Sequence, residues 1–288
     1  MKELLSPKQV ASSIGVSESS LKRWCDQGVI ATERTPGGHR RIRIGEVVRF
    51  LREQQHPLVQ PEVLGLPPGT GSGPRAASKA RDALLESLNS GQIDQSRRVV
   101  IDQFLAGNSV VRLCEELIAP AMHTIGEEWQ CGRIEIYQEH RACEVLNRVL
   151  YDLRTILPPT QPGSPLAMGG TPPGDNYRLA SLMVELVLVD AGWDAISLGS
   201  SLPFSTLTAA AKQQNPRLFW LSFSHVANID DSVSGFVEFL ADTPQTMHVV
   251  LGGQQLPTGL PQSDRVHQCT DLGSLRTLLE TLKPFDAA

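Results

Sequence analysis

Amphipathic segments open the chain. Ser6 stands as an N-cap and Gln9, three residues later, completes a capping box, so a first helix is predicted to begin here. Ser17 is predicted to cap a second helix after a glycine-containing turn, and a third, closing helix is expected at Glu46–Gln54. Two short helices joined by such a turn are typical of a helix-turn-helix. The pattern therefore predicts a small helical head over residues 1–55.

A longer helical stretch follows a region rich in proline and glycine. Residues 56–76 contain five of the 20 prolines and are expected to form a linker. Beyond it, apolar residues recur at helical spacing across residues 77–158, with glycines at the breaks. This pattern predicts a four-helix bundle. Its helices are expected at residues 79–89, 94–105, 108–126 and 135–155.

The last part of the chain alternates between short apolar runs and amphipathic stretches. The runs are predicted to be strands beginning at Leu166, Ala195, Leu218, His248 and Val266. Strands that alternate with helices favour a parallel sheet, here over residues 164–288. The fold class expected for the whole chain is multidomain, α followed by α/β. Ligands of such sheets bind at the carboxyl ends of the strands.

Charge is unevenly distributed along a chain of otherwise ordinary composition. Hydrophobic residues make up 41%, and neither a membrane-spanning run nor a signal-peptide core is visible. The five cysteines show no paired spacing, so we expect a reduced cytoplasmic chain with no structural metal and no membrane partner. Residues 1–56 hold ten basic and six acidic residues, a charge of +4, which leaves −9 of the total of −5 on the remainder. A basic head on an acidic body favours a head that binds nucleic acid.

Polar and basic side chains of the head suit a DNA partner. The second helix is expected to present a set fitted to the major groove: Ser19, Ser20, Lys22 and Arg23. Gly37-Gly38 predicts a tight hairpin whose basic arms form a wing against phosphates. The wing residues expected to contact DNA are Arg34, His39, Arg40 and Arg41. The alternative is a solvated basic mini-domain that contacts protein.

Three stretches of the head carry a family pattern. They are Leu5-Ser6-Pro7-Lys8-Gln9-Val10-Ala11, Leu21-Lys22-Arg23-Trp24 and Thr35-Pro36-Gly37-Gly38-His39-Arg40-Arg41-Ile42. Together they resemble the winged helix-turn-helix of the MerR and excisionase families over nearly all of residues 4–54. The resemblance implies a double-stranded DNA partner. In a dimer it would place two recognition helices one DNA turn apart.

In the bundle, nine residues separate Trp129 from the pair Glu139-His140. By chemistry alone the pair is open to interpretation as an acid/base couple, a metal fragment or a polar contact, and no second metal ligand lies at helical spacing. The spacing resembles the helical cap of cobalamin-binding modules, especially in CarH/LitR-type regulators, which have His where this chain has Gln130. The resemblance implies that all three side chains lie near the upper face of a corrin. The alternative makes Trp129 bundle core and Glu139 a helix N-terminal acid.

The α/β part shows no nucleotide-fold or hydrolase motif after its first strand, so no catalytic residue is assigned and a non-enzyme is expected. Four short pieces carry a different pattern: Gly174-Asp175, Leu198-Gly199, Leu221-Ser222 and Gly252-Gly253. They resemble the flavodoxin-like cobalamin-binding domain. The resemblance implies that Ser222, Gly252 and Gly253 line the slot for the dimethylbenzimidazole tail, where small residues let the backbone approach a flat ligand.

One position departs from this family. Its motif is Asp-x-His-x-x-Gly, whose His ligates cobalt from below, and this chain has Asp175 followed by Tyr177 and Ala180. A phenol is a poorer neutral donor to cobalt than an imidazole. Three outcomes stay open: cobalamin bound without the lower His, another large flat ligand such as a tetrapyrrole, or no ligand in a module kept for assembly.

Together the head and the module indicate a DNA-binding transcriptional regulator, a repressor of the CarH/LitR type. Its module is expected to form a homodimer or homotetramer and to sense a corrinoid or light. A cofactor-free regulator is one alternative, and a corrinoid carrier for a methyltransferase or mutase is another. A recombination accessory of the excisionase type accounts for the head alone and leaves over two hundred residues unexplained.

Overall fold

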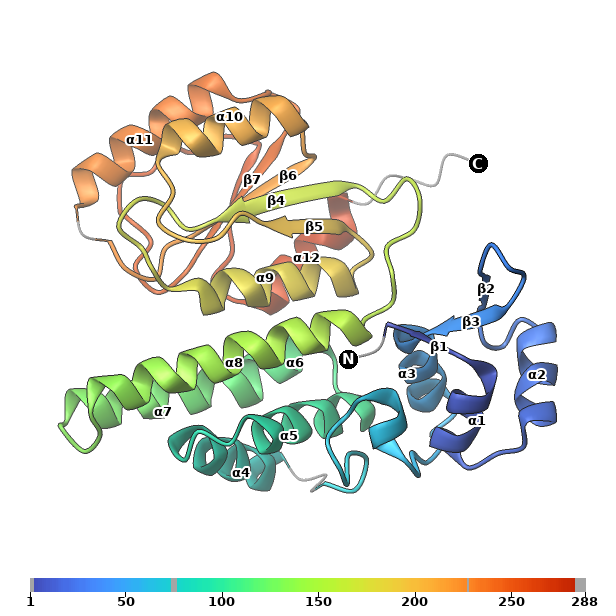
Figure 1. Ribbon diagram of the computed structural model, residues 1–288. Helices are drawn as coiled ribbons and strands as arrows, with labels where there is room; N and C mark the ends of the chain where they lie inside the picture. The colour runs from blue at the N-terminus through green and yellow to red at the C-terminus, as the bar shows by residue number, and fades with distance from the viewer. Residues whose placement is uncertain (1–2, 74–76, 227, 283–288) are drawn as a thin grey trace. The chain divides into compact units, whose positions relative to one another are not determined.

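The structure, a computed structural model, describes residues 3–73, 77–226 and 228–282. The chain divides at Pro159 into two compact units, drawn from blue to green and from yellow to red in Figure 1. The first unit holds the predicted head and bundle, and the second holds the predicted α/β domain. Residues 1–2 of the head, 74–76 of the linker and 283–288 of the α/β domain lie outside the described residues.

The head is a winged helix-turn-helix, as predicted. Ser6 accepts a hydrogen bond from the backbone N–H of Gln9, and the Gln9 side chain accepts one from the N–H of Ser6, which is the expected capping box. Gly15 ends the first helix with a φ of 73° and turns the chain toward the second. The elements are α1 (Pro7–Ile14), α2 (Glu18–Asp26), β2 (Glu33–Arg34), β3 (Arg40–Arg43) and α3 (Ile44–Glu53).

Strand β1 (Leu4–Leu5) adds a third strand that the sequence pattern does not predict. It pairs antiparallel with β3, so that Leu5 lies opposite Ile42, and both side chains are fully buried. Two residues are too few for an alternation of apolar and polar positions, which is why the pattern is silent here.

The described part of the expected linker is folded. The 3-10 helix η1 (Pro61–Leu64) buries Leu64 completely. The N–H of Val59 donates to the carbonyl of Ser13 in α1 over 2.8 Å. At the other end, the N–H of Gly71 donates to Asp102 in the bundle over 2.5 Å. The prolines and glycines therefore set the turns of a folded connection that contacts both the head and the bundle.

The bundle has the four predicted helices. They are α4 (Ala77–Asn89), α5 (Ile93–Leu105), a third helix in three parts, α6 (Val110–Arg112), η2 (Leu113–Ile118) and α7 (Ala119–Gln130), and α8 (Ile136–Ile156). Apolar residues of these helices form a buried core, in which Val100 and Leu146 are 0% exposed. Segment η2 is a π-helix, and Pro120 stands two residues after its end. Because proline has no N–H to donate to the preceding turn, it accounts for the local change in hydrogen bonding.

Helix α3 of the head packs on the bundle within the first unit. The guanidinium of Arg52 lies 3.8 Å from the ring centroid of Phe104 and donates to the carbonyl of Asn108 over 3.1 Å. At the start of α3, a Cβ added to Gly45 would lie 2.6 Å from the carbonyl oxygen of Leu157. Only glycine allows this approach, so the head and the bundle form one unit.

The second unit is a five-stranded parallel sheet of the flavodoxin-like order β5-β4-β6-β7-β8. The strands are β4 (Leu166–Gly170), β5 (Asp194–Ser197), β6 (Leu218–Ser222), β7 (His248–Gly252) and β8 (Val266–Gln268). The helices are α9 (Arg178–Asp190), α10 (Phe204–Gln214), α11 (Ile229–Asp242) and α12 (Leu272–Leu282). Figure 1 shows α10 and α11 on one face of the sheet, and α9 and α12 on the other. The predicted fold class is confirmed.

Aromatic side chains fill the core of this unit. Phe219 of β6 packs on Phe239 of α11, with ring centroids 5.2 Å apart. On the other face, Trp220 is 1% exposed and its indole N–H donates to Ser181 over 2.8 Å. A Cβ added to Gly169 would lie 2.3 Å from the Trp220 ring, so the glycine makes room for the indole.

Candidate functional site

Helix α2 presents polar side chains at its start. The hydroxyl of Ser17 accepts from the N–H of Ser20 over 3.1 Å and lies 2.9 Å from the hydroxyls of both Ser19 and Ser20. Lys22 pairs with Glu18 one turn earlier over 2.9 Å. All four predicted α2 residues are at least partly exposed, and the fourth, Arg23, has no ion-pair partner among the described residues.

The wing is the hairpin predicted around Gly37-Gly38. The N–H of Gly38, at a φ of 78°, donates to the carbonyl of Thr35, and Arg34 donates to the carbonyl of Gly38 over 3.2 Å. Arg34 and His39 are exposed at the tip. The structure thus places both side chains where an external partner can reach them.

Arg40 has a partner inside the head. Its guanidinium donates to Asp26 at the end of α2 over 2.6 Å and approaches the carbonyl of Lys22 at 3.5 Å. The hydrogen bond to Asp26 raises the pKa of Arg40. Arg41 donates to the carbonyl of Arg40 over 3.3 Å and is half-buried. Arg40 therefore ties the wing to α2, a contact that the sequence reasoning missed.

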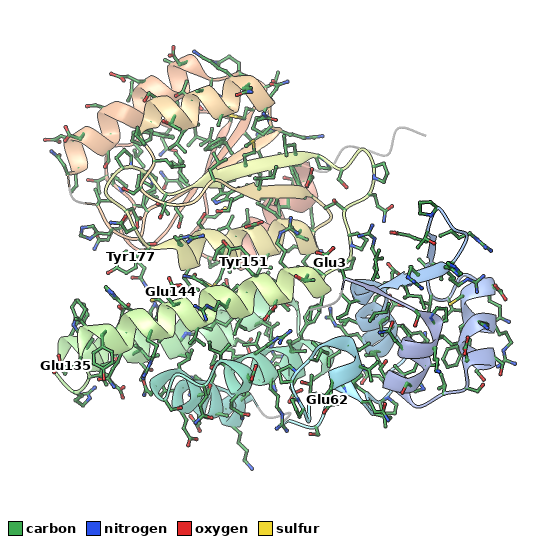
Figure 2. All side chains as sticks on the ribbon, in the orientation of Figure 1. Glu3, Glu62, Glu135, Glu144, Tyr151 and Tyr177 are labelled. Atoms are coloured by element: carbon green, nitrogen blue, oxygen red, sulfur yellow. The ribbon has the colours of Figure 1, made fainter. Side chains whose placement is uncertain are left out.

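At the far end of the bundle, Trp129 is 39% exposed near the C-terminus of α7. This exposure contradicts the alternative in which Trp129 belongs to the bundle core. Ile136 and Tyr137, at the start of α8, are also exposed. The three large apolar side chains suit a large apolar ligand or partner. Figure 2 labels Glu135, the N-cap of α8, which directly precedes Ile136 in the chain.

Glu139 and His140 lie in the first turns of α8 with different surroundings. Glu139 is largely buried and accepts a hydrogen bond from the thiol of Cys143 over 3.3 Å. Burial, with the carboxylate of Glu139 beside it, raises the pKa of Cys143 to about 12, so the thiol stays protonated. His140 lies 3.6 Å from Glu139 and its side chain is 72% exposed. The pair can hold a polar group of a ligand.

Asp175 fastens the loops at the carboxyl edge of the second unit. Its carboxylate is fully buried and accepts three backbone hydrogen bonds: from Tyr177 over 2.9 Å, from Ser224 over 2.6 Å and from His225 over 3.1 Å. Its carbonyl accepts another from the N–H of Ser201 over 2.9 Å. One residue thus links the loops that follow β4, β5 and β6.

Tyr177, labelled in Figure 2, is the N-cap of α9. Its side chain is 50% exposed. Its ring centroid lies 6.5 Å from that of His225 in the loop after β6. Sequence reasoning missed His225. The signal that points to it is its place three residues after Ser222, at the end of a parallel strand where ligands of such folds bind.

Ser222 and Gly252 lie opposite each other at the ends of β6 and β7. Ser222 is 4% exposed. Gly253 has a φ of 114°, and a Cβ there would lie 2.3 Å from the carbonyl oxygen of Phe223. Gly253 therefore allows a close approach between two parts of the chain itself, and Ser222 is buried at the end of β6.

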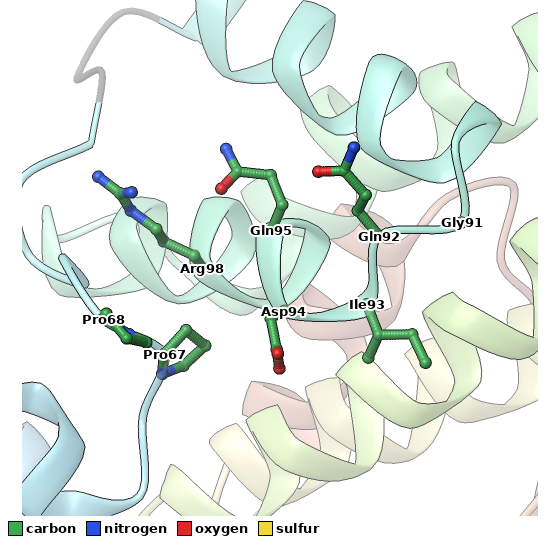
Figure 3. A pocket seen from close by; sticks show the side chains of 8 residues that line it. All are labelled: Pro67, Pro68, Gly91, Gln92, Ile93, Asp94, Gln95 and Arg98. Atoms are coloured by element: carbon green, nitrogen blue, oxygen red, sulfur yellow. The ribbon is translucent and has the colours of Figure 1, made fainter.

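A separate hollow of about 470 Å³ opens on the first unit between the linker and α5 (Figure 3). Its walls include Pro67, Pro68 and Arg98, and none of its lining residues is a predicted site residue. We assign it no role. In the described part of the chain, no group of three or more His, Cys, Asp and Glu side chains is placed to hold a bare metal ion. No helix found there is long and apolar enough to cross a membrane.

The residues at the carboxyl edge nonetheless fit a ligand that brings its own metal. The imidazole of His225 and the phenol of Tyr177 lie beside each other there, with ring centroids 6.5 Å apart. A corrinoid carries a cobalt ion, for which an imidazole nitrogen is a suitable ligand.

Comparison with known proteins relates these features to a family. A helix-turn-helix domain family matches residues 4–55, and a B12 binding domain family matches residues 80–153. Over 264 residues, the chain is 23% identical to the HTH-type transcriptional repressor CarH of Myxococcus xanthus, covering 84% of this chain and 86% of that protein. The chain is CarH-like. The resemblance to CarH-type regulators stated from the sequence is confirmed.

The CarH-like chain also shares its fold with a solved corrinoid protein. The monomethylamine corrinoid protein of Methanosarcina barkeri aligns with 72% of this chain and 100% of its own length, at a TM-score of 0.60 and 13% identity. At this identity the likeness concerns the fold alone. It covers a larger share of the CarH-like chain than the bundle that the B12 binding domain family matches.

Proposed function

We propose that this CarH-like chain is a transcriptional repressor in the cytoplasm that binds operator DNA through its head and a corrinoid through its module. One observation carries the proposal: three features occur in one chain. They are a winged helix-turn-helix with an exposed basic surface, a bundle that matches a B12 binding domain family, and an α/β fold shared with a corrinoid protein. In this view the body forms a homodimer or homotetramer. Corrinoid binding, or light acting on the corrinoid, controls that assembly.

At the DNA, the side chains of α2 enter the major groove and those of the wing contact phosphates. Ser19, Ser20, Lys22 and Arg23 contact base edges from α2. Arg34, His39 and Arg41 contact the backbone from the wing. Arg40 keeps its bond to Asp26 and holds the wing in position against α2. Its role is therefore to position the wing, which departs from the phosphate contact expected from its place in the sequence.

In the bundle, the residues that would contact a corrinoid are Trp129, Glu139 and His140. In the second unit, Asp175 holds the loops of the carboxyl edge, and the residues that would contact the ligand there are Tyr177, Ser222, Gly252 and Gly253. When bound, adenosylcobalamin supplies a cobalt–carbon bond that light cleaves. The side chains of this chain bind and orient the ligand, and the proposed role involves no catalytic step.

A cofactor-free regulator is the second candidate. The observation that favours it is the saturation of Asp175, whose carboxylate is satisfied by three backbone N–H groups of the chain itself. The carboxyl edge is thus held together without a ligand, and the module would serve assembly alone. A corrinoid carrier for a methyltransferase has less support, because such a carrier has no use for a DNA-binding head.

The test is to purify the full chain in the dark with adenosylcobalamin and to record its visible spectrum, its size and its retardation of a promoter fragment. A retained corrin spectrum, with a size and a DNA affinity that change on illumination, is the expected result. A colourless protein that still binds DNA would support the cofactor-free candidate. Failure to bind any DNA at low salt, where phosphate contacts are strongest, would refute both candidates.

The matched variants are Trp129→Ala and Tyr151→Ala, both of which remove an exposed aromatic side chain from the bundle. We expect Trp129→Ala to lose most of the bound corrinoid and Tyr151→Ala to lose less. Equal retention by both variants would remove Trp129 from the proposed site.

A further inference from the structure

His225 has an unusual position at the carboxyl edge of the second unit. It follows β6, and its backbone N–H donates to the buried carboxylate of Asp175 over 3.1 Å. The neighbouring Ser224 donates to the same oxygen over 2.6 Å. The backbone at His225 is therefore fixed by a carboxylate that no solvent competes for, since Asp175 is 0% exposed.

The imidazole of His225 is held less firmly than its backbone. The residue is exposed, and no hydrogen bond or ion pair joins its ring to another side chain in the described residues. Its ring neighbour is Tyr177, with centroids 6.5 Å apart and planes inclined at 53°. Both imidazole nitrogens thus remain available to an external partner at the point where ligands of parallel α/β sheets bind.

The available donors differ in what they can bind. The carboxylate of Asp175 is buried and already accepts three hydrogen bonds, so it cannot turn toward a ligand. A phenol such as Tyr177 must lose its proton before it becomes a strong metal ligand. Imidazole nitrogen is a common ligand of the late first-row metals in its neutral form.

We infer that His225 supplies the axial nitrogen to the cobalt ion of a corrinoid bound at the carboxyl edge of this sheet. The inference deepens the proposed function and rests on its corrinoid-binding part. The imidazole ligand then comes from the loop after β6. Tyr177 lies in a different loop, the one that follows β4. Asp175 is then a positioning residue, because it accepts hydrogen bonds from the backbone N–H groups of Ser224 and His225 and so fixes the backbone that carries the imidazole.

The experiment uses the full chain with its histidines labelled with ¹⁵N, loaded with unlabelled cobalamin and reduced to the Co²⁺ form. An axial nitrogen splits each cobalt line of the electron paramagnetic resonance spectrum, into a triplet for ¹⁴N and a doublet for ¹⁵N. A doublet therefore reports a protein histidine, whereas a triplet reports the cofactor's own benzimidazole. The variants are His225→Gln and, as a matched control, His123→Gln, which changes an exposed histidine of α7.

We expect a doublet in the parent chain and in His123→Gln. In His225→Gln the doublet should disappear while the visible spectrum still shows bound corrinoid. A triplet or an unsplit line in the parent chain would overturn the inference and leave corrinoid binding intact. A doublet that survives in His225→Gln would assign the ligand to another histidine and also overturn the inference. Absence of any bound corrinoid would overturn the inference together with the corrinoid part of the proposed function.

Discussion

The DNA-binding head and the carboxyl edge of the second unit are held in place by contacts of different range. In the head, the capping box joins Ser6 to a residue three positions away, and the wing turn closes over similar distances. At the carboxyl edge, Asp175 bonds to residues 49 and 50 positions further along the chain. Local contacts leave a signature in the sequence, and a site built from distant loops leaves almost none. The same difference predicts which substitutions each region tolerates.

The largest effect should follow from Asp175→Ala. Removing this buried carboxylate leaves three backbone N–H groups without an acceptor, so we expect the second unit to lose about 3–5 kcal/mol of unfolding free energy. Denaturant unfolding monitored by circular dichroism measures it. Asp264→Ala is the control, since Asp264 is exposed in the same unit. Equal losses in the two variants would show that the carboxyl edge does not depend on Asp175.

Gly253→Ala should have the next largest effect. The φ of 114° is strained for alanine, and the added Cβ would lie 2.3 Å from the carbonyl oxygen of Phe223, so we expect a loss of about 3 kcal/mol. Gly192→Ala is a matched control, because Gly192 has a φ of 85° with nothing within 4 Å of the added Cβ. It should cost about 1 kcal/mol. Similar costs for both variants would mean that the loops beside Gly253 move apart easily.

In the head, Arg34→Ala and Arg40→Ala should differ in the salt dependence of DNA binding. If Arg34 contacts a phosphate, its loss lowers the slope of log affinity against log salt by about 0.9. Arg40→Ala should leave the slope nearly unchanged, because this guanidinium is paired with Asp26. Fluorescence anisotropy with a labelled duplex at several salt concentrations gives both slopes. A reduced slope for Arg40→Ala would show that Arg40 leaves Asp26 for the DNA.

The smallest effect concerns pH. His248 and His267, on β7 and β8, lie with Nδ1 and Nε2 3.0 Å apart. Burial lowers the pKa of both, and for His248 the neighbouring His267, Arg217 and Arg265 lower it further. Below a pH of about 6.5 the unfolded chain therefore binds more protons than the folded one, so stability is complete above that pH and declines as the pH falls.

Thermal unfolding between pH 7.5 and about 5 should therefore show a modest fall in the melting temperature of the second unit. His267→Gln should weaken this dependence, and His123→Gln in the first unit should not alter it. A melting temperature of the parent chain that rises toward low pH would contradict the assignment of both histidines.

The sequence predicts most elements of this fold, but it does not predict the long-range contacts that hold its candidate sites in place. The bundle helix predicted at residues 135–155 spans Ile136–Ile156, because the apolar spacing that predicts it is local. The pairing of β1 with β3, the folded connection at residues 57–73 and the bond between Arg40 and Asp26 all depend on contacts that no periodicity records. His225 was missed for the same reason. The sequence does not distinguish a Trp129 in the bundle core from one that faces a ligand, and its exposed fraction of 39% excludes the core position.

Three of the four tryptophans differ in their exposure to solvent between the two units. Trp193 and Trp220 are 0% and 1% exposed in the second unit, whereas Trp129 is 39% exposed at the end of the bundle. The emission of Trp193 and Trp220 should be blue-shifted and insensitive to quenching by iodide. The emission of Trp129 should be red-shifted and readily quenched by iodide. A ligand that absorbs visible light and binds beside Trp129 would quench this red-shifted emission first. The unlabelled chain therefore carries its own fluorescent reporter of what reaches the bundle end.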